Sequence, residues 1–248
     1  MVISSYDNAR IAEIVKLTQK KYRRLARRYV IEGARLVADA LKHGAKVLSV
    51  YVSESVASAF NFDSQVVVAD RVFAKIADTV NSQGVLAVVQ MDEDKLSEPT
   101  GNCLVLDGLQ DPGNVGTLIR TAAACGFTDV YAVNSVDLYS PKVLRSAMSA
   151  HFCVKLHELD EVENAFALLS GVEVVCADMG GSNVFETEFN GKTALVVGNE
   201  GNGLSAYSKA HAARSVALPM ANGFESLNVA VAGSVIMYQI FKESNIRR

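Results

Sequence analysis

The chain has 248 residues, enough for one large domain or two of ordinary size. Half of its residues are hydrophobic and 21% are charged, as in a soluble globular protein with a proper core. It contains no run of 18 apolar residues, and its N-terminus lacks a basic end followed by an apolar block, so we expect neither a membrane-spanning helix nor a signal peptide.

The net charge of −3 conceals an uneven distribution of charge along the chain. Residues 1–50 hold 11 Lys and Arg against 4 Asp and Glu, whereas the remaining residues hold 13 against 23. A basic pole on an otherwise acidic protein indicates a polyanionic partner such as RNA or DNA, although a solvated helix face is the alternative interpretation. The candidate RNA-binding residues form one basic run with an aromatic residue inside it: Lys20, Lys21, Arg23, Arg24, Arg27 and Arg28.

The four cysteines are scattered through apolar surroundings without CxxC spacing: Cys103, Cys125, Cys153 and Cys176. This pattern predicts buried free thiols in a reducing cytoplasm rather than a disulfide framework or a zinc site. We therefore expect a cytoplasmic protein without a bound metal.

The first 91 residues are predicted to form a small α/β domain. The helices expected there are 6–18, 32–43 and 70–77, and the strands are 29–31, 46–52, 65–69 and 85–90. The first helix should bury one apolar side, formed by Ile11, Ile14, Val15 and Leu17. Basic residues from 16 to 28 are expected on a helix that leads into the first strand. Residues 92–101 are polar and contain Pro99 and Gly101, which predicts a linker.

Residues 102–248 alternate strands and helices, a pattern that predicts a parallel sheet covered on both faces. The expected strands are 103–107, 129–133, 153–156, 172–177, 194–198 and 214–218. The expected helices are 114–125, 141–149, 161–170, 203–209 and 226–241. The last helix is apolar on nearly every side, so we expect it to be buried within its domain or against another subunit.

Three polar, glycine-rich segments directly follow apolar strands, within 104–120, 194–205 and 218–232. Because open α/β folds bind ligands at the carboxyl ends of their strands, these segments fit a single site. In the third segment Pro219 ends the strand, Ser226 is a candidate N-cap for the final helix, and Asn228 needs a partner inside an apolar helix.

The three segments do not match the common nucleotide or hydrolase motifs. Residues 198–203 contain three glycines but not GxGxxG, and no P-loop Lys-Ser/Thr pair follows them. The four histidines lie outside all three segments, which disfavours a Ser/His/Asp hydrolase. A nucleotide-dependent oxidoreductase is thus only weakly indicated.

Taken together, the segments resemble the three signature motifs of the SpoU (TrmH) family of RNA ribose 2′-O-methyltransferases, in the SPOUT class. The first motif matches 111–120, the second 197–205 and the third 218–220 with 225–229, and residues 140–150 resemble the region between the first two. The resemblance covers residues 102–242. The N-terminal domain resembles a substrate-binding domain with an RNA-binding fold shared with ribosomal proteins, most closely at 31–41.

The resemblance implies an S-adenosylmethionine-dependent α/β fold whose chain end is tucked through a loop as a deep trefoil knot. Members of the family are typically homodimers that pack through the knot region. The positions associated with catalysis or RNA placement match Asn114, Arg120, Glu200, Ser226 and Asn228. The cofactor pocket maps onto Gly198, Asn199, Leu218, Met220, Leu227 and Asn228.

Each polar position also has a purely structural alternative. Asn114 could cap a helix, Glu200 could hold its own loop, and Arg120 could pair with Asp107 or Asp111. One departure from the family pattern is Ala230, where many members have serine, which puts a secondary hydrogen bond in doubt.

The implied reaction is transfer of a methyl group from S-adenosylmethionine to a ribose 2′-hydroxyl of structured RNA. The two-domain layout favours ribosomal RNA as the substrate. Transfer RNA methylation is the alternative, and a non-catalytic RNA-binding ribosome-assembly factor is a second one, against which the intact motif residues argue. Since arginine stays protonated in proteins, our hypothesis is that Arg120 binds a substrate phosphate and lowers the pKa of the hydroxyl.

Overall fold

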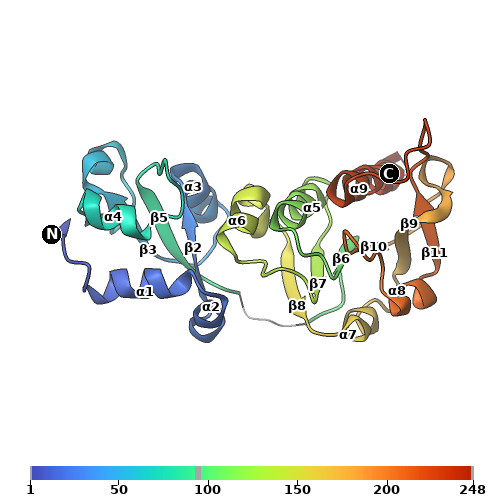
Figure 1. Cartoon of the computed structure of the whole chain (residues 1–248), viewed down its shortest axis with the longest axis horizontal. Helices are drawn as coiled ribbons and strands as arrows, with labels where there is room; N and C mark the ends of the chain where they lie inside the picture. The colour runs from blue at the N-terminus through green and yellow to red at the C-terminus, as the bar shows by residue number, and fades with distance from the viewer. Residues whose placement is uncertain (1, 93–95, 247–248) are drawn as a thin grey trace. The chain divides into compact units, whose positions relative to one another are not determined.

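The computed structural model describes residues 2–92 and 96–246 (Figure 1). The chain divides into two compact units, Met1–Glu93 with Tyr139–Leu144, and Asp94–Leu138 with Arg145–Arg248. The grouping of Tyr139–Leu144 with the first unit differs from the division expected from sequence. Part of the expected linker, residues 93–95, lies outside the described residues.

The first unit is built on a mixed five-stranded sheet in the order β1-β4-β3-β5-β2. Its strands are β1 (Val2–Ile3), β2 (Arg28–Glu32), β3 (Val47–Ser53), β4 (Val66–Val68) and β5 (Val85–Gln90). Its helices are α1 (Ala9–Leu17), α2 (Lys20–Ala26), α3 (Ala34–Lys42) and α4 (Asp70–Ile76), with a 3₁₀ turn η1 (Glu54–Ala59). Strand β5 runs antiparallel to both of its neighbours, and β4 runs parallel to β1 and β3.

The apolar spacing of α1 produces the core of this unit. Ile11, Ile14 and Leu17 are buried and pack with α4 and the sheet, as predicted. Val15 is an exception to the prediction, because 39% of it is exposed. Its position is next to Ile14, about 100° around the helix axis, which turns it away from the sheet.

The single basic helix expected from residue 16 to 28 is wrong, because the structure has a break between α1 and α2. At Thr18 the chain leaves the helix, and the Thr18 hydroxyl donates back to the Val15 carbonyl at 2.7 Å. The Arg23 guanidinium then donates to the carbonyls of Leu17 at 2.8 Å and Thr18 at 2.6 Å. These bonds satisfy carbonyl groups that the end of a helix leaves unpaired.

The second unit is built on a six-stranded sheet, parallel throughout, in the order β11-β9-β10-β6-β7-β8. Its strands are β6 (Cys103–Asp107), β7 (Asp129–Val133), β8 (Lys155–Leu159), β9 (Glu173–Asn183), β10 (Thr193–Gly198) and β11 (Arg214–Ala217). Its helices are α5 (Pro112–Ala124), α7 (Val162–Ala167), α8 (Ala206–His211) and α9 (Val229–Ile246), with 3₁₀ turns η2 (Met148–Phe152) and η3 (Val184–Glu186). Helix α6 (Pro141–Ala147) begins in the segment grouped with the first unit and ends in the second. The predicted parallel α/β fold is confirmed, and β6 and β7 have the predicted bounds.

Two pairs of helices cover this sheet, α5 with α9 and α7 with α8, on opposite faces in Figure 1. On the α7 and α8 side, buried residues of alternating positions, such as Val105 and Val196, join one apolar cluster. On the other side Gly233 of α9 lies so close to α5 that an added Cβ would be 2.6 Å from the Leu118 side chain. The alternation agrees with apolar strands that are buried on both faces.

The final helix differs from the prediction at its start. It begins at Val229 instead of residue 226, and its N-cap is Asn228, whose Oδ1 accepts from the N–H groups of Ala230 at 2.9 Å and Val231 at 3.3 Å. Val231 of this helix is 48% exposed in the single chain, so burial of the helix within its own domain is incomplete, and burial against another subunit stays a prediction. The threading of the chain end into a trefoil knot stays a prediction.

Three of the cysteines, Cys103, Cys125 and Cys176, are buried free thiols, whereas Cys153 is exposed, contrary to the prediction. Burial raises the pKa of the Cys125 thiol to about 11. None of the helices in residues 2–92 and 96–246 has the length and apolar character needed to cross a membrane.

Candidate active site

The parallel sheet brings the three motif segments to one edge. Strands β6 and β10 are neighbours, and their last residues, Asp107 and Gly198, are register partners. The loops that follow them, 108–111 and 199–203, therefore start side by side. Helix α9, which the third segment leads into, packs on α5 and β10.

A chain of side-chain hydrogen bonds connects all three segments. The Asn114 Nδ2 atom, at the start of α5, donates to Glu200 Oε1 in the second segment at 3.1 Å. The Asn228 Nδ2 atom, in the third segment, donates to Asn114 Oδ1 at 3.0 Å. The amide of Asn114 is thus held from both ends, which fixes its orientation.

Glu200 also accepts two main-chain hydrogen bonds from the first loop. Its Oε2 accepts from the Gln110 N–H at 3.2 Å and its Oε1 from the Asp111 N–H at 3.1 Å. Partial burial raises the pKa of the Glu200 carboxyl, but the hydrogen bonds from Asn114 and from main-chain N–H groups outweigh burial and lower it overall. Glu200 is therefore ionised at neutral pH and is suited to holding the loop, not to accepting a proton.

The structural alternative for Asn114 as a helix cap is wrong. Helix α5 is capped by Asp111, whose Oδ1 accepts from the Asn114 N–H at 2.8 Å, with Pro112 in the first turn. The side chain of Asn114 is consequently left to bind Glu200 and Asn228.

Arg120 lies on the exposed side of α5, two turns after Asn114. Within the described part of the chain its guanidinium makes no hydrogen bond or ion pair. Asp107 instead accepts from the Ser205 N–H at 2.9 Å and the Ser208 hydroxyl at 2.7 Å, and Asp111 caps α5. The expected alternative, a salt bridge from Arg120 to either aspartate, is absent among the described residues.

The second loop folds around Asn199. The Asn199 Nδ2 atom donates to the Gly108 carbonyl at 2.7 Å, and its Oδ1 accepts from the N–H groups of Gly201 and Asn202, both at 2.9 Å. A Cβ on Gly198 would lie 2.4 Å from the main chain of Gly203, so this turn requires glycine at 198.

The predicted cofactor residues lie around the same edge. Gly198 ends β10, Leu218 follows β11, and Met220 and Leu227 are 37% and 46% exposed in the loop before α9. Ser226 also lies in this exposed loop, outside the helix. Exposed apolar side chains beside main-chain groups at strand ends suit a purine, so the residues fit the adenosine part of S-adenosylmethionine.

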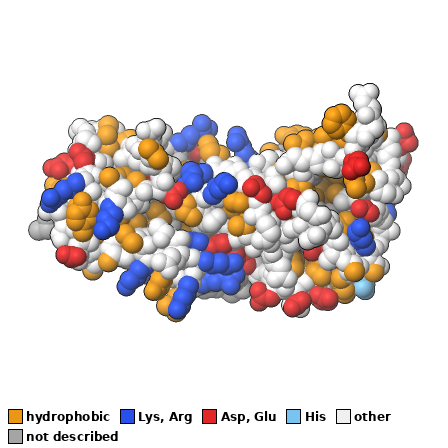
Figure 2. Space-filling view, viewed as in Figure 1, with side chains coloured by type: hydrophobic (Ala, Val, Ile, Leu, Met, Phe, Trp, Pro, Cys, Tyr) orange, Lys and Arg blue, Asp and Glu red, His pale blue; other side chains and the backbone are white. Residues whose placement is uncertain are grey.

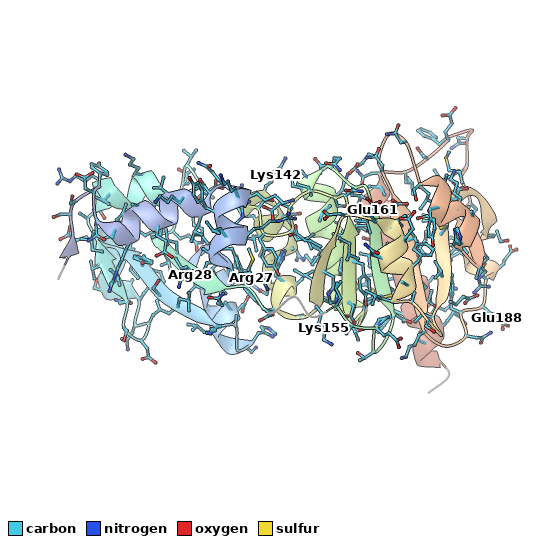
Figure 3. The ribbon with its side chains drawn as sticks, turned by 90° about the horizontal axis from the view of Figure 1, so that it is seen from below. Arg27, Arg28, Lys142, Lys155, Glu161 and Glu188 are labelled. Carbon is cyan, nitrogen blue, oxygen red and sulfur yellow. The ribbon has the colours of Figure 1, made fainter. Side chains whose placement is uncertain are left out.

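The residues of the basic run differ in exposure, and Arg23 is buried. Arg23 is only 4% exposed, and the bonds described above fix its guanidinium inside the first unit. Arg28 pairs with Glu13 at 2.5 Å and lies with Arg27 where α2 passes into β2 (Figure 3). Figure 2 shows Lys and Arg side chains gathered over this region. Lys20, Lys21 and Arg24 lie on α2 and are exposed.

The structure also shows residues that the sequence interpretation missed. Asp107, buried at the end of β6, connects this strand to the start of α8 by accepting hydrogen bonds from Ser205 and Ser208. In the sequence, the only sign of this role is that Asp107 is a polar residue at the end of an apolar strand. Over residues 2–92 and 96–246, no group of three or more His, Cys, Asp or Glu is placed to hold a metal ion.

Comparison with known families is decisive for the second unit. The model of the SpoU rRNA methylase family matches residues 101–238, more than half of the chain. The chain belongs to this family. The MRM3-like substrate binding domain matches residues 8–87. The predicted family and the predicted type of N-terminal domain are confirmed.

Relatives of this SpoU methylase match it over nearly its whole length. It is 32% identical to an uncharacterised tRNA/rRNA methyltransferase of Synechocystis (96% of this chain, 92% of the relative). It is 31% identical to the 23S rRNA (guanosine(2553)-2′-O)-methyltransferase RlmP of Bacillus subtilis (96% and 98%). The solved structure of the SpoU methyltransferase AviRb of Streptomyces viridochromogenes with AdoMet superposes with a TM-score of 0.86 at 25% identity (96% and 98%). The prediction of an S-adenosylmethionine-dependent RNA methyltransferase is confirmed.

Proposed function

We propose that this SpoU methylase transfers the methyl group of S-adenosylmethionine to a ribose 2′-hydroxyl of ribosomal RNA, and that Asn114, Arg120, Glu200, Ser226 and Asn228 form its active site. The observation that carries the assignment of the site is the hydrogen-bonded chain Glu200–Asn114–Asn228, which joins all three motif segments. Relatives named as 23S rRNA 2′-O-methyltransferases support the choice of ribosomal RNA.

The chain's own residues provide alignment and charge. When bound, S-adenosylmethionine supplies an electrophilic methyl group on a sulfonium. The guanidinium of the exposed Arg120 is available to bind an RNA phosphate. Binding of that phosphate would align the ribose hydroxyl beside the cofactor and so make the reaction effectively unimolecular. The positive charge of Arg120 also favours the ionised form of a nearby hydroxyl, which lowers the pKa of that hydroxyl. The fixed amide of Asn114 orients the reacting groups.

The test of this function is transfer of radiolabel from S-adenosylmethionine to ribosomal RNA purified from cells that lack the enzyme. We expect label in ribosomal RNA, released on digestion as a nucleoside methylated on the ribose. Label in transfer RNA alone would contradict the proposed substrate. An enzyme that binds the cofactor but labels neither naked RNA nor ribosomal particles would contradict the proposed reaction.

We further propose that the exposed part of α2 binds the RNA. Replacing Lys20, Lys21 and Arg24 with glutamine should weaken binding of ribosomal RNA, because three phosphate contacts and their released counterions are lost. The negative slope of log K against log salt concentration should become less steep by roughly 2–3. Filter binding at several salt concentrations measures both quantities. Lys155→Gln, on the second unit's β8, is the matched control, and an unchanged slope in the triple variant would exclude this role for α2.

A homodimer that packs through α9 is also part of the proposal. The support is the apolar exposed side of this helix, where Val231 is 48%, Tyr238 54% and Phe241 37% exposed, and Figure 2 shows hydrophobic side chains at the surface around α9. The cytoplasmic location stays a prediction.

Val231→Glu should convert such a dimer into monomers, because a buried and unpaired carboxylate is costly at an apolar interface. Sedimentation equilibrium would measure the change in mass. The control is Glu243→Gln, on the same helix at a half-buried position. If the Val231→Glu protein sediments with the same mass as the unmodified protein, α9 is not the interface.

A further inference from the structure

A row of hydrogen bonds continues from the active site across the carboxyl edge of the sheet. Before the first motif, the Gln110 Nε2 atom donates to the carbonyl of Asn134 at 2.7 Å and to that of Gly108 at 3.2 Å. Asn134 follows β7, and its own Nδ2 donates to the Asp160 carbonyl after β8 at 2.6 Å. The row therefore connects the ends of β8, β7, β6 and β10 to the start of α9.

We propose that Gln110 is a positioning residue that acts through Glu200, an inference that rests on the proposed function. Its side chain clamps the loop between β6 and α5 to the neighbouring strand end. That clamp aims the N–H groups of Gln110 and Asp111 at the Glu200 carboxylate. Glu200 then holds Asn114, and Asn114 holds Asn228.

The acceptor for this clamp is built into the end of β7. Asn134 adopts a left-handed conformation, with φ of 44°, which asparagine tolerates better than most residues. Its N–H donates to the Leu159 carbonyl at 3.0 Å and its side chain to Asp160, so its own carbonyl has a fixed direction toward Gln110.

The exposure of Gln110 means that its hydrogen bonds should affect the geometry of the site more than the stability of the fold. Gln110 and Asn134 are both exposed, so water can replace their hydrogen bonds when the loop opens. Loss of the clamp should consequently change the geometry of the site much more than the stability of the fold. A displacement of about 1 Å at a catalytic group can lower a rate by roughly a hundredfold.

The experiment compares Gln110→Met, which has the same length without N–H donors, with Gln65→Met. Gln65 also bonds main-chain groups, of Ala57 and Phe62, but lies in the first unit. With S-adenosylmethionine and ribosomal RNA from cells that lack the enzyme, kcat should fall by roughly 10- to 100-fold in Gln110→Met and stay unchanged in Gln65→Met. The affinity for S-adenosylhomocysteine and the melting temperature should each change by a similar amount in the two variants. An unchanged kcat in Gln110→Met overturns the proposal.

A double-mutant cycle with Glu200→Ala tests the route of the effect. If Gln110 acts through Glu200, Gln110→Met should lower kcat little further in a protein that already carries Glu200→Ala. Effects that multiply would show that Gln110 acts by another route, and would overturn the proposal.

Hydrogen exchange keeps this test separate from the proposed function. In the unmodified protein the hydrogen bonds to Glu200 should protect the N–H groups of Gln110 and Asp111, and in the Gln110→Met protein the amides of residues 108–114 should exchange faster. If the unmodified enzyme fails to label ribosomal RNA, the proposed function is wrong, and hydrogen exchange alone then tests whether Gln110 holds the loop. Faster exchange then supports the clamp, and equal exchange overturns it.

Discussion

Replacing Arg120 with alanine is expected to lower methyl transfer to ribosomal RNA by about 10²- to 10³-fold, the usual loss when one positioned donor for developing charge is removed. The structure leaves this guanidinium exposed, and within its described residues Asp107 and Asp111 are bonded elsewhere. Binding of S-adenosylhomocysteine should be retained, since the predicted cofactor residues lie on the other two segments. Initial rates and calorimetric binding measure the two effects.

Arg120→Lys tests the geometry of the interaction beyond its charge. Lysine keeps the positive charge but lacks the planar fork that binds phosphate through two N–H groups, so we expect most of the transfer activity to be lost. Arg10→Ala, at an exposed arginine of α1, is the matched control and should keep full activity. Full activity in the Arg120→Lys variant would disprove the role assigned to Arg120.

Replacing Asp129 with alanine is expected to lower the free energy of unfolding by about 1–3 kcal/mol, the cost of leaving a buried polar group without its hydrogen-bond partner. Asp129 begins β7 and is fully buried, and its Oδ1 bonds His157 Nε2 on β8 at 3.0 Å. The Thr128 hydroxyl donates to its Oδ2 at 2.6 Å, and Tyr131 stacks on the His157 ring at 4.7 Å. Without the carboxylate, the His157 Nε2 would be buried without a partner.

Urea denaturation at neutral pH measures this loss. Asp129→Asn keeps an acceptor oxygen for His157 and should lose less than the alanine variant. Asp129 is the first residue of β7, at the opposite end of the strands from the site, so the cofactor affinity of the folded variants should be unchanged. An alanine variant as stable as the unmodified protein would show that the pair does not stabilise the fold.

The same carboxylate predicts a dependence of stability on pH. Burial raises the pKa of Asp129, but hydrogen bonds from His157 and Thr128 and the nearby Lys155 outweigh it, so the pKa in the fold is lower than usual. The unfolded chain therefore binds the proton more readily, and stability falls with falling pH. The contribution should be complete above about pH 4, the ordinary value for aspartate, and be lost below it. Over that range the stability of Asp129→Asn should approach that of the unmodified protein.

The local sequence was sufficient for the family, for the parallel sheet and for the meeting of the three motif segments at one edge of it. Apolar strands buried on both faces read as continuous apolar runs, so the bounds of β6 and β7 could be predicted. Polar segments after such strands had to meet at one edge, because parallel strands all end on the same side. The family followed from three motifs in order, and its model matches residues 101–238.

Only the tertiary structure decided which partner each polar side chain has. Asn114 bonds Glu200, 86 residues away, and Asn228, 114 residues away, and no local pattern records such pairs. Asn228 also displaced Ser226 as the cap of the last helix, because its oxygen reaches two N–H groups while its amide reaches Asn114. Arg23 looked like its basic neighbours in the sequence, but the break after Leu17 turned it inward to carbonyls that needed donors. Periodicity reports which side of an element is apolar, whereas hydrogen-bond partners depend on distances that exist only after the elements have packed.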